Sequence, residues 1–164
     1  MHEAGRIENA GLVLTAPFLP HFFRNLGFLD VMRFATEEAH AKALYLLQYM
    51  ADGGDYVEGD LSLNALLCGW PLSRPVPAPP ALSAVEKQQA DQVVEAIRAH
   101  WTVLGGMAPD ALRAAFFRRQ GTLDIGLETS LVVAPQPQDT FLRELPWVYA
   151  VTRTPWSETI RVEW

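Results

Sequence analysis

The hydrophobic pattern of this 164-residue chain changes its period at Gly121, and that change limits which folds the chain can adopt. Before Gly121, apolar residues recur three and four positions apart, as on the buried face of an α-helix. After Gly121, they alternate with polar residues, as in a β-strand with one buried face. The sequence therefore predicts an α+β fold, in which a part of about five helices over residues 7–121 precedes a small antiparallel sheet over residues 122–164.

Proline, glycine and capping signals bound the five helices. Ser83, followed by Glu86 three residues later, predicts a capping box at the start of one of them. The apolar stripe of that helix continues through Trp101 to Leu104, and Gly105 is expected to end it. The five predicted helices cover residues 18–26, 37–50, 61–68, 84–104 and 109–121, and residues 10–17 are expected to be extended.

Five prolines between Pro71 and Pro80 interrupt the helical part. Proline has no backbone N–H and holds φ near −65°, so this stretch is predicted to be extended and free of ladder hydrogen bonds. We interpret residues 71–82 as a connector within a single domain that spans residues 1–164. A protein-binding motif of the PxxP kind is the alternative interpretation.

After Gly121, three segments have the pattern of strands. The first covers residues 123–133, where apolar and polar residues alternate. Two phrases of the same form follow, Leu-Pro-Trp at 145–147 and Thr-Pro-Trp at 154–156, and they lead into the apolar segments 148–152 and 160–164. We expect these segments to pair as the antiparallel sheet.

The amino-acid composition disfavours some classes of binding partner. The net charge is −6 and no basic patch is visible, which disfavours nucleic acid as a partner. Mean hydropathy is +0.05, and no apolar run approaches the ~18 residues that a spanning helix needs. The one cysteine, Cys68, excludes an internal disulfide framework and fits a reducing compartment. We therefore expect a cytoplasmic protein that binds neither nucleic acid nor a membrane.

No motif in the chain demands catalysis, a cofactor or a metal. Glu37 and His40 have the spacing of a di-iron helix pair, but a second such pair is missing, so His40 is interpreted as a solvated helix residue. The acidic loop 52–60 lacks the ligand spacing of a calcium loop and its closing glutamate. Cys68 is interpreted as a small core residue. We expect no enzyme, because a hydrolase would need converging carboxylates or histidines in a pocket.

The most unusual feature of the amino-acid composition is its five tryptophans. Trp147 and Trp156 each follow a proline, and Trp164 is the last residue given. Two interpretations stay open for these three rings. They pack inside the domain, or they anchor a partner protein, since tryptophan is enriched at the centres of interfaces. Trp147, Trp156 and Trp164 are thus the candidate partner interface.

Several phrases, taken in order along the chain, resemble one known family, the contractile injection system tape measure protein, in its C-terminal region. The resemblance runs from about Ile7 to Trp164. The phrases that carry it are Ala-Gly-Leu-Val-Leu-Thr-Ala-Pro-Phe-Leu-Pro at 10–20, Leu-Tyr-Leu-Leu-Gln-Tyr-Met at 44–50, Leu-Asn-Ala-Leu-Leu-Cys-Gly at 63–69, His-Trp at 100–101, Leu-Arg-Ala-Ala-Phe-Phe-Arg-Arg-Gln-Gly at 112–121, Leu-Pro-Trp at 145–147, Pro-Trp at 155–156 and Val-Glu-Trp at 162–164.

The resemblance implies a structural role in assembling a phage-tail-like particle, in which a tape measure protein sets the length of the inner tube. The implied partners are protein components of that particle, in the tube, baseplate or cap. A molecular ruler needs extended helix at about 1.5 Å per residue. This chain holds 12 prolines and 11 glycines, so we expect a compact terminal module that docks on another component, or an excerpt of a longer protein. A stand-alone adaptor or chaperone-like protein-binding domain is the alternative function.

Overall fold

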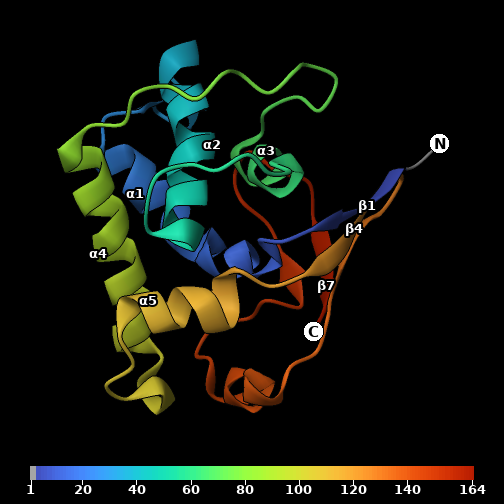
Figure 1. Cartoon of the computed structure of the whole chain (residues 1–164). Helices are drawn as coiled ribbons and strands as arrows, with labels where there is room; N and C mark the ends of the chain where they lie inside the picture. The colour runs from blue at the N-terminus through green and yellow to red at the C-terminus, as the bar shows by residue number, and fades with distance from the viewer. Residues whose placement is uncertain (1–2) are drawn as a thin grey trace.

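The computed structural model describes residues 3–164 and has the predicted α+β fold (Figure 1). The strands gather on one side of the molecule and most of the helices on the other. The helical elements are η1 (Ala10–Phe18), α1 (Leu19–Asn25), α2 (Glu37–Asp52), α3 (Ser62–Cys68), α4 (Ala84–His100), η2 (Thr102–Leu104), α5 (Pro109–Leu112), η3 (Arg113–Phe117) and η4 (Pro137–Glu144). The strands are β1 (Glu3–Ile7), β2 (Leu29–Asp30), β3 (Arg33–Phe34), β4 (Gly121–Ile125), β5 (Thr129–Val133), β6 (Val151–Thr152) and β7 (Ile160–Glu163).

The starts of the two longest helices follow from local capping chemistry. The side-chain oxygen of Thr36 accepts a hydrogen bond from the N–H of Ala39 at 3.0 Å, which satisfies a free donor at the start of α2. At the start of α4, the side chains of Ser83 and Glu86 each accept a hydrogen bond from the other's backbone N–H. The predicted capping box is therefore confirmed.

Three helical segments differ from the prediction. Residues 10–18, expected to be largely extended, form the 3-10 helix η1, whose residues from Ala10 to Ala16 are all buried. The helix expected to reach Leu104 ends at His100. Trp101 leaves helical geometry there with ψ 74°, and its ring Nε1 donates to the carbonyl of Phe141 at 2.9 Å. The tertiary contact of the Trp101 ring therefore ends the helix earlier than the spacing of apolar residues predicts.

The third difference lies in the segment that begins at Pro109. It was expected to continue as one α-helix, but α5 gives way after Leu112 to the π-helical turn η3. Such a turn adds one residue to a helix and shifts the faces of the residues that follow. Phe116 and Phe117 are both fully buried at this turn, so two consecutive rings enter the core from one short element.

The main sheet is mixed, which corrects the expectation of a wholly antiparallel one. Its five strands lie in the order β1-β4-β5-β7-β6. β5 pairs with β7 in parallel, with Thr129 opposite Ile160, whereas the other pairs are antiparallel. The chain travels from β5 through η4 and a long loop before it returns as β7, and this crossover allows the parallel pairing. Alternation of residues within a strand carries no information on its direction.

Two further details of the sheet differ from the prediction. The edge strand β1 comes from the start of the chain, where no strand was expected, and its Ile7 lies opposite Gly121 of β4. The segment 123–133 is a hairpin, β4 and β5, rather than one strand. One face of the sheet is buried, and its buried apolar residues are Ile7, Leu123, Leu131, Val133, Ile160 and Val162. Helices and sheet share one continuous hydrophobic core.

The element η1 lies at the centre of this core, in contact with α1, α2, α3, α4, η3 and β5. At Gly11 it meets the backbone of η3 without an intervening side chain. A Cβ atom added at Gly11 would lie 1.6 Å from the carbonyl oxygen of Phe116, a distance that no packed atoms tolerate. Glycine is therefore required at this position for steric reasons.

We expect Gly11→Ala to lower the free energy of unfolding by about 3 kcal/mol or more, because the added methyl group forces two backbones apart. Gly5→Ala is the matched control, since a Cβ at Gly5 meets nothing within 4 Å. That control is expected to stay within about 0.5 kcal/mol of the parent chain. Urea unfolding followed by circular dichroism measures both, and equal stabilities of the two variants would contradict the steric argument.

Candidate partner interface

The three tryptophans of the candidate interface are each half-buried and lie in different aromatic neighbourhoods. Trp147 packs edge-on against Phe18, with ring centroids 5.1 Å apart. Its Nε1 donates to the carbonyl of Leu14 at 3.1 Å. Trp147 therefore holds the loop before β6 against η1.

Trp164 directly follows the last strand, β7. Its ring packs edge-on against Tyr149, at 5.7 Å between centroids, and the guanidinium carbon of Arg119 lies 5.4 Å from its ring centre. Arg119 is itself buried and donates to both carboxylate oxygens of Asp139, at 2.6 and 2.8 Å. Burial alone would raise the pKa of Asp139, but hydrogen bonds from Arg119 and from the Gln136 N–H outweigh it and hold that pKa below its usual range.

Trp156 joins the C-terminal segment to the hairpin β2–β3. Its Nε1 donates to the carbonyl of Met32 at 2.8 Å. Its ring packs against Phe23 and Phe34, at centroid distances of 5.6 and 5.3 Å. The backbone of Gly69 approaches closely on another side, because a Cβ there would lie 2.6 Å from the Cβ of Trp156. Packing within the fold explains this position of Trp156, whose ring is half-buried.

The turn of the same hairpin presents apolar side chains to solvent. Val31 is 84% exposed and Met32 is 40% exposed. Val31 has φ 58°, the left-handed conformation, and it is the one non-glycine residue with positive φ in the described part of the chain. This conformation costs a β-branched residue about 1–2 kcal/mol. We call Val31, Met32 and the adjoining Trp156 the hairpin tip.

His40 packs against Phe34 of β3, which corrects its interpretation as a solvated residue. Its ring stacks on Phe34 at 4.3 Å and 8° and meets Trp70 edge-on at 5.0 Å. Its Nε2 lies 2.7 Å from the carbonyl oxygen of Cys68 and donates to it. Desolvation lowers the pKa of His40, so the imidazole is held in its neutral form.

The sequence did not lead us to predict that two arginines, Arg113 and Arg119, are buried. Arg113 donates to the carbonyl of Met50 at 3.0 Å and pairs with Asp91 at 2.7 Å. Arg119 forms the pair with Asp139 described above. Arginine is usually a surface residue, so composition gives no hint of this burial. Both arginines lie in the phrase at 112–121, one of those that carry the family resemblance, and this phrase is the feature of the sequence that could have indicated their importance.

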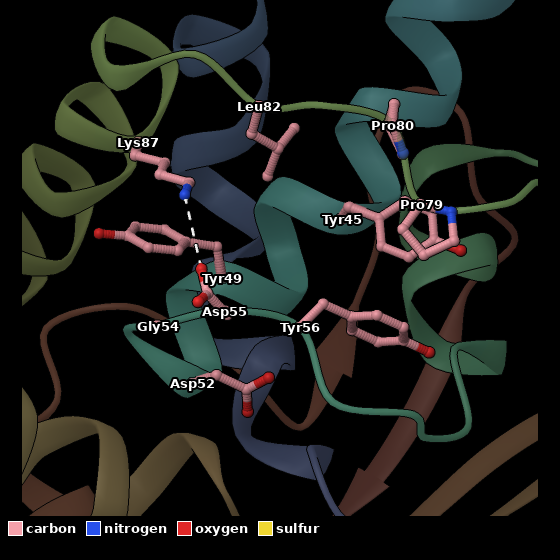
Figure 2. Close-up of a pocket in the computed structure, with 10 residues that line it drawn as sticks. All are labelled: Tyr45, Tyr49, Asp52, Gly54, Asp55, Tyr56, Pro79, Pro80, Leu82 and Lys87. Atoms are coloured by element: carbon pink, nitrogen blue, oxygen red, sulfur yellow. Dashed lines mark ion pairs between the residues drawn. The ribbon is translucent and has the colours of Figure 1, made fainter.

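A tyrosine-lined pocket of about 210 Å³ lies between α2, the loop that follows it and the proline-rich segment before α4 (Figure 2). Tyr45 and Tyr56 meet edge-on with centroids 5.1 Å apart, and Tyr49 lies beside them on α2. Three charged residues line it, Asp52, Asp55 and Lys87, and Lys87 Nζ lies 3.9 Å from an Asp55 carboxylate oxygen. We call this space the tyrosine pocket, and its interior suits apolar groups.

The described residues offer little else for chemistry. Among residues 3–164, no group of three or more histidine, cysteine, aspartate or glutamate side chains is placed to hold a metal ion. Burial raises the pKa of the Cys68 thiol far above its usual range, so Cys68 is an unreactive core residue. No helix in this part of the chain has both the length and the apolar character needed to cross a bilayer.

The neutral state of His40 predicts a pH dependence of stability. Folding lowers the pKa of His40 below the unfolded value near 6.5, so the unfolded chain takes up the proton first as the pH falls. The free energy of unfolding should therefore decrease as the pH drops below about 6.5. We expect His40→Gln, which keeps a donor for the Cys68 carbonyl, to lose less stability than the parent over that range. Parallel urea curves at several pH values measure this, and an identical loss in both chains would contradict it.

The strain at Val31 predicts an unusual effect of removing its side chain. Glycine adopts positive φ without steric cost but loses more backbone entropy on folding. We therefore expect Val31→Gly to leave the free energy of unfolding unchanged or to raise it by up to about 1 kcal/mol. Thermal and urea unfolding measure the effect, and a clear destabilisation would show that the Val31 side chain supports the fold.

Comparison with known proteins gives a family match over nearly the whole chain. A family model described as contractile injection system tape measure protein matches residues 2–164. The matched range includes both the helices and the mixed sheet, so the similarity does not rest on a single motif. No curated protein and no solved structure matches the chain.

Proposed function

Because the chain belongs to the contractile injection system tape measure protein family, we propose that it acts as a non-enzymatic assembly module that contributes to control of tube length. The family indicates a structural protein that associates with other components of the particle. Within that frame, we place the module in the cytoplasm, inside the assembling particle. Its partner would be a protein of the tube, the baseplate or the cap.

The fold supports a docking role rather than a ruler role for the described residues. Their longest helix, α4, has 17 residues and spans about 26 Å. A ruler would need helix of the length of the tube it measures. A compact segment instead affects tube length by where it attaches, because it would hold one end of a longer assembly in place.

The hairpin tip is the observation on which the docking proposal rests. Val31 and Met32 are apolar and exposed, and the half-buried ring of Trp156 adjoins them. Aromatic residues and methionine are enriched at interface centres. A strained residue with an exposed side chain is also typical of a functional position, since nothing inside the fold gains from its orientation. Trp147 and Trp164 are proposed as further, more peripheral contacts.

Electron microscopy of particles from cells that carry defined variants tests this function. Deletion of the segment should abolish particles or scatter their tube lengths. Val31→Gly should have a similar but weaker effect, although the chain stays folded, because it removes an exposed apolar contact without adding strain. Val85→Ala is the matched control, since Val85 is also an exposed valine, 60% exposed, but belongs to α4 and not to the hairpin.

Particles of normal number and uniform length after the deletion would contradict the assembly function. A stand-alone adaptor or chaperone-like function would then be the better explanation. Normal particles with Val31→Gly, but not with the deletion, would keep the assembly function and reject the hairpin tip as its contact. The two variants therefore separate the function from the surface assigned to it.

A further inference from the structure

Strand β1 forms one edge of the main sheet, and Figure 1 shows it at the margin of the molecule beside β4. Among the described residues, β4 is its one pairing partner. The opposite edge of the sheet is β6, which has two residues, whereas β1 has five and contains no proline. A very short edge strand offers little for another chain to pair with, but a longer one presents a row of free backbone groups.

The register of the sheet shows which backbone groups of β1 are free. In an antiparallel pair, successive residues alternate between facing the neighbouring strand and facing away from it. The N–H of Ala134, just after β5, donates to the carbonyl of Gln120 at 2.8 Å, so the even-numbered residues of β4 face β5 and its odd-numbered residues face β1. The odd-numbered residues of β1 lie opposite these and face β4. The N–H and carbonyl groups of Ala4 and Arg6 therefore point outward, where no strand of the described chain pairs with them.

Two adjoining hollows lie against β1. The smaller, of about 120 Å³, is lined by Gly5 and Ile7 on the buried face of the sheet and by Asp60 and Ser62 at the start of α3. A Cβ added at Gly5 would meet nothing within 4 Å, so the space beside this residue is open. The larger, of about 570 Å³, lies between the end of β1 and the loop 52–60. Ile7 and Asp60 line both hollows, which together we call the β1 groove.

The larger hollow of the β1 groove is acidic. Five carboxylate residues line it, against two arginines. Arg6 pairs with Glu8 at 3.4 Å, and the guanidinium of Arg118 donates to backbone carbonyls at the end of α2. Glu58 and Asp60 form no ion pair among the residues that the structure describes. The hollow therefore favours a positively charged group.

A buried acceptor in the same hollow also lacks a partner. Asn9 is 4% exposed and lines the hollow. Its Nδ2 donates to the side-chain oxygens of Gln48 and Asn64, each at 2.8 Å, but its Oδ1 has no hydrogen-bond partner within residues 3–164. Buried polar groups are nearly always hydrogen-bonded. This oxygen, like the carboxylates around it, is therefore suited to a donor from outside the described residues.

We propose that the β1 groove binds an extended segment of a partner protein, which adds to the sheet as a further strand beside β1. Backbone hydrogen bonds to Ala4 and Arg6 supply affinity, and alternate side chains supply selectivity. Side chains on the same face of neighbouring strands lie side by side, so one inward side chain of the partner lies beside Gly5 and the next beside Ile7. The open space at Gly5 fits an apolar side chain, and the acidic hollow beyond Ile7 fits lysine or arginine. The partner segment is thus one with an apolar and a basic residue two positions apart.

The test is a titration of the full, isotopically labelled chain with the blocked peptide Thr-Lys-Thr-Val-Thr-Lys-Thr, which presents valine between two lysines in either strand direction. Nuclear magnetic resonance measures binding and the exchange of each backbone amide with water. We expect saturable binding and at least tenfold slower exchange of the Ala4 and Arg6 N–H groups. The N–H of Gly5 already faces β4, so its exchange should change less. The titration needs no particle, so its outcome is independent of the assembly function.

Two control peptides separate backbone pairing from side-chain contacts. Methylation of the three central backbone nitrogens removes the N–H groups that would pair with β1, and we expect it to abolish binding. Replacement of both lysines by glutamate should weaken binding at least tenfold, because the acidic hollow then repels the peptide.

Variants of the chain test the same two contributions. Ala4→Pro removes an outward N–H and leaves the pairing with β4, since proline is tolerated on edge strands. It should weaken binding at least tenfold, whereas Ala4→Ser should stay within about twofold of the parent. The double variant Glu58→Gln with Asp60→Asn should weaken binding at least threefold. Glu158→Gln, which removes an exposed carboxylate outside the groove, should match the parent.

Four results would overturn the proposal. The first is no binding at millimolar peptide, and the second is binding that leaves the exchange of Ala4 and Arg6 unchanged. The third is slower exchange of these two amides in the chain alone as its concentration rises, because a second copy would then be the occupant of the edge. The fourth is undiminished binding of the methylated peptide, which decides the matter even if Ala4→Pro does not fold.

Discussion

The contact between Gly11 and the backbone of Phe116 is the constraint on which the rest of the structure depends. It lets η1 pass through the centre of the core with its backbone against η3. The register is fixed nearby, where the N–H of Ala10 donates to the carbonyl of Arg119 at 2.9 Å. Gly121 starts β4 two residues later, and a Cβ there would lie 2.9 Å from the Cβ of Ala10. Two glycines thus join the helical core to the sheet without room for a side chain.

The C-terminal segment is attached to this framework by indole N–H groups. Trp147 donates to Leu14 on η1, and Trp156 donates to Met32 in the β2–β3 turn. An indole buries a large apolar ring and also satisfies a backbone carbonyl, so one residue supplies both packing and a hydrogen bond. Trp101, Trp147 and Trp156 each combine ring packing with such a hydrogen bond. Packing and partner binding are compatible for a half-buried ring.

The hairpin tip and the proline-rich segment are connected through a series of packed rings. Trp156 packs on Phe34, Phe34 stacks on His40, and His40 meets Trp70. The guanidinium of Arg74, near the start of the proline-rich segment 71–82, lies over Trp70. The hairpin tip and this segment are far apart in sequence and are therefore held by one continuous set of packed rings.

The sequence by itself determined the local features of this protein. The period change at Gly121, the capping box of Ser83 and Glu86 and the extended proline-rich segment 71–82 depend on interactions between near neighbours, so they can be predicted without a structure. The ordered phrases along the chain also identified the family. The tertiary structure alone decided that β5 and β7 run in parallel, that η1 is a buried 3-10 helix, and that Arg113 and Arg119 lie inside. These outcomes depend on contacts between residues far apart in the chain, and local pattern carries no record of such contacts.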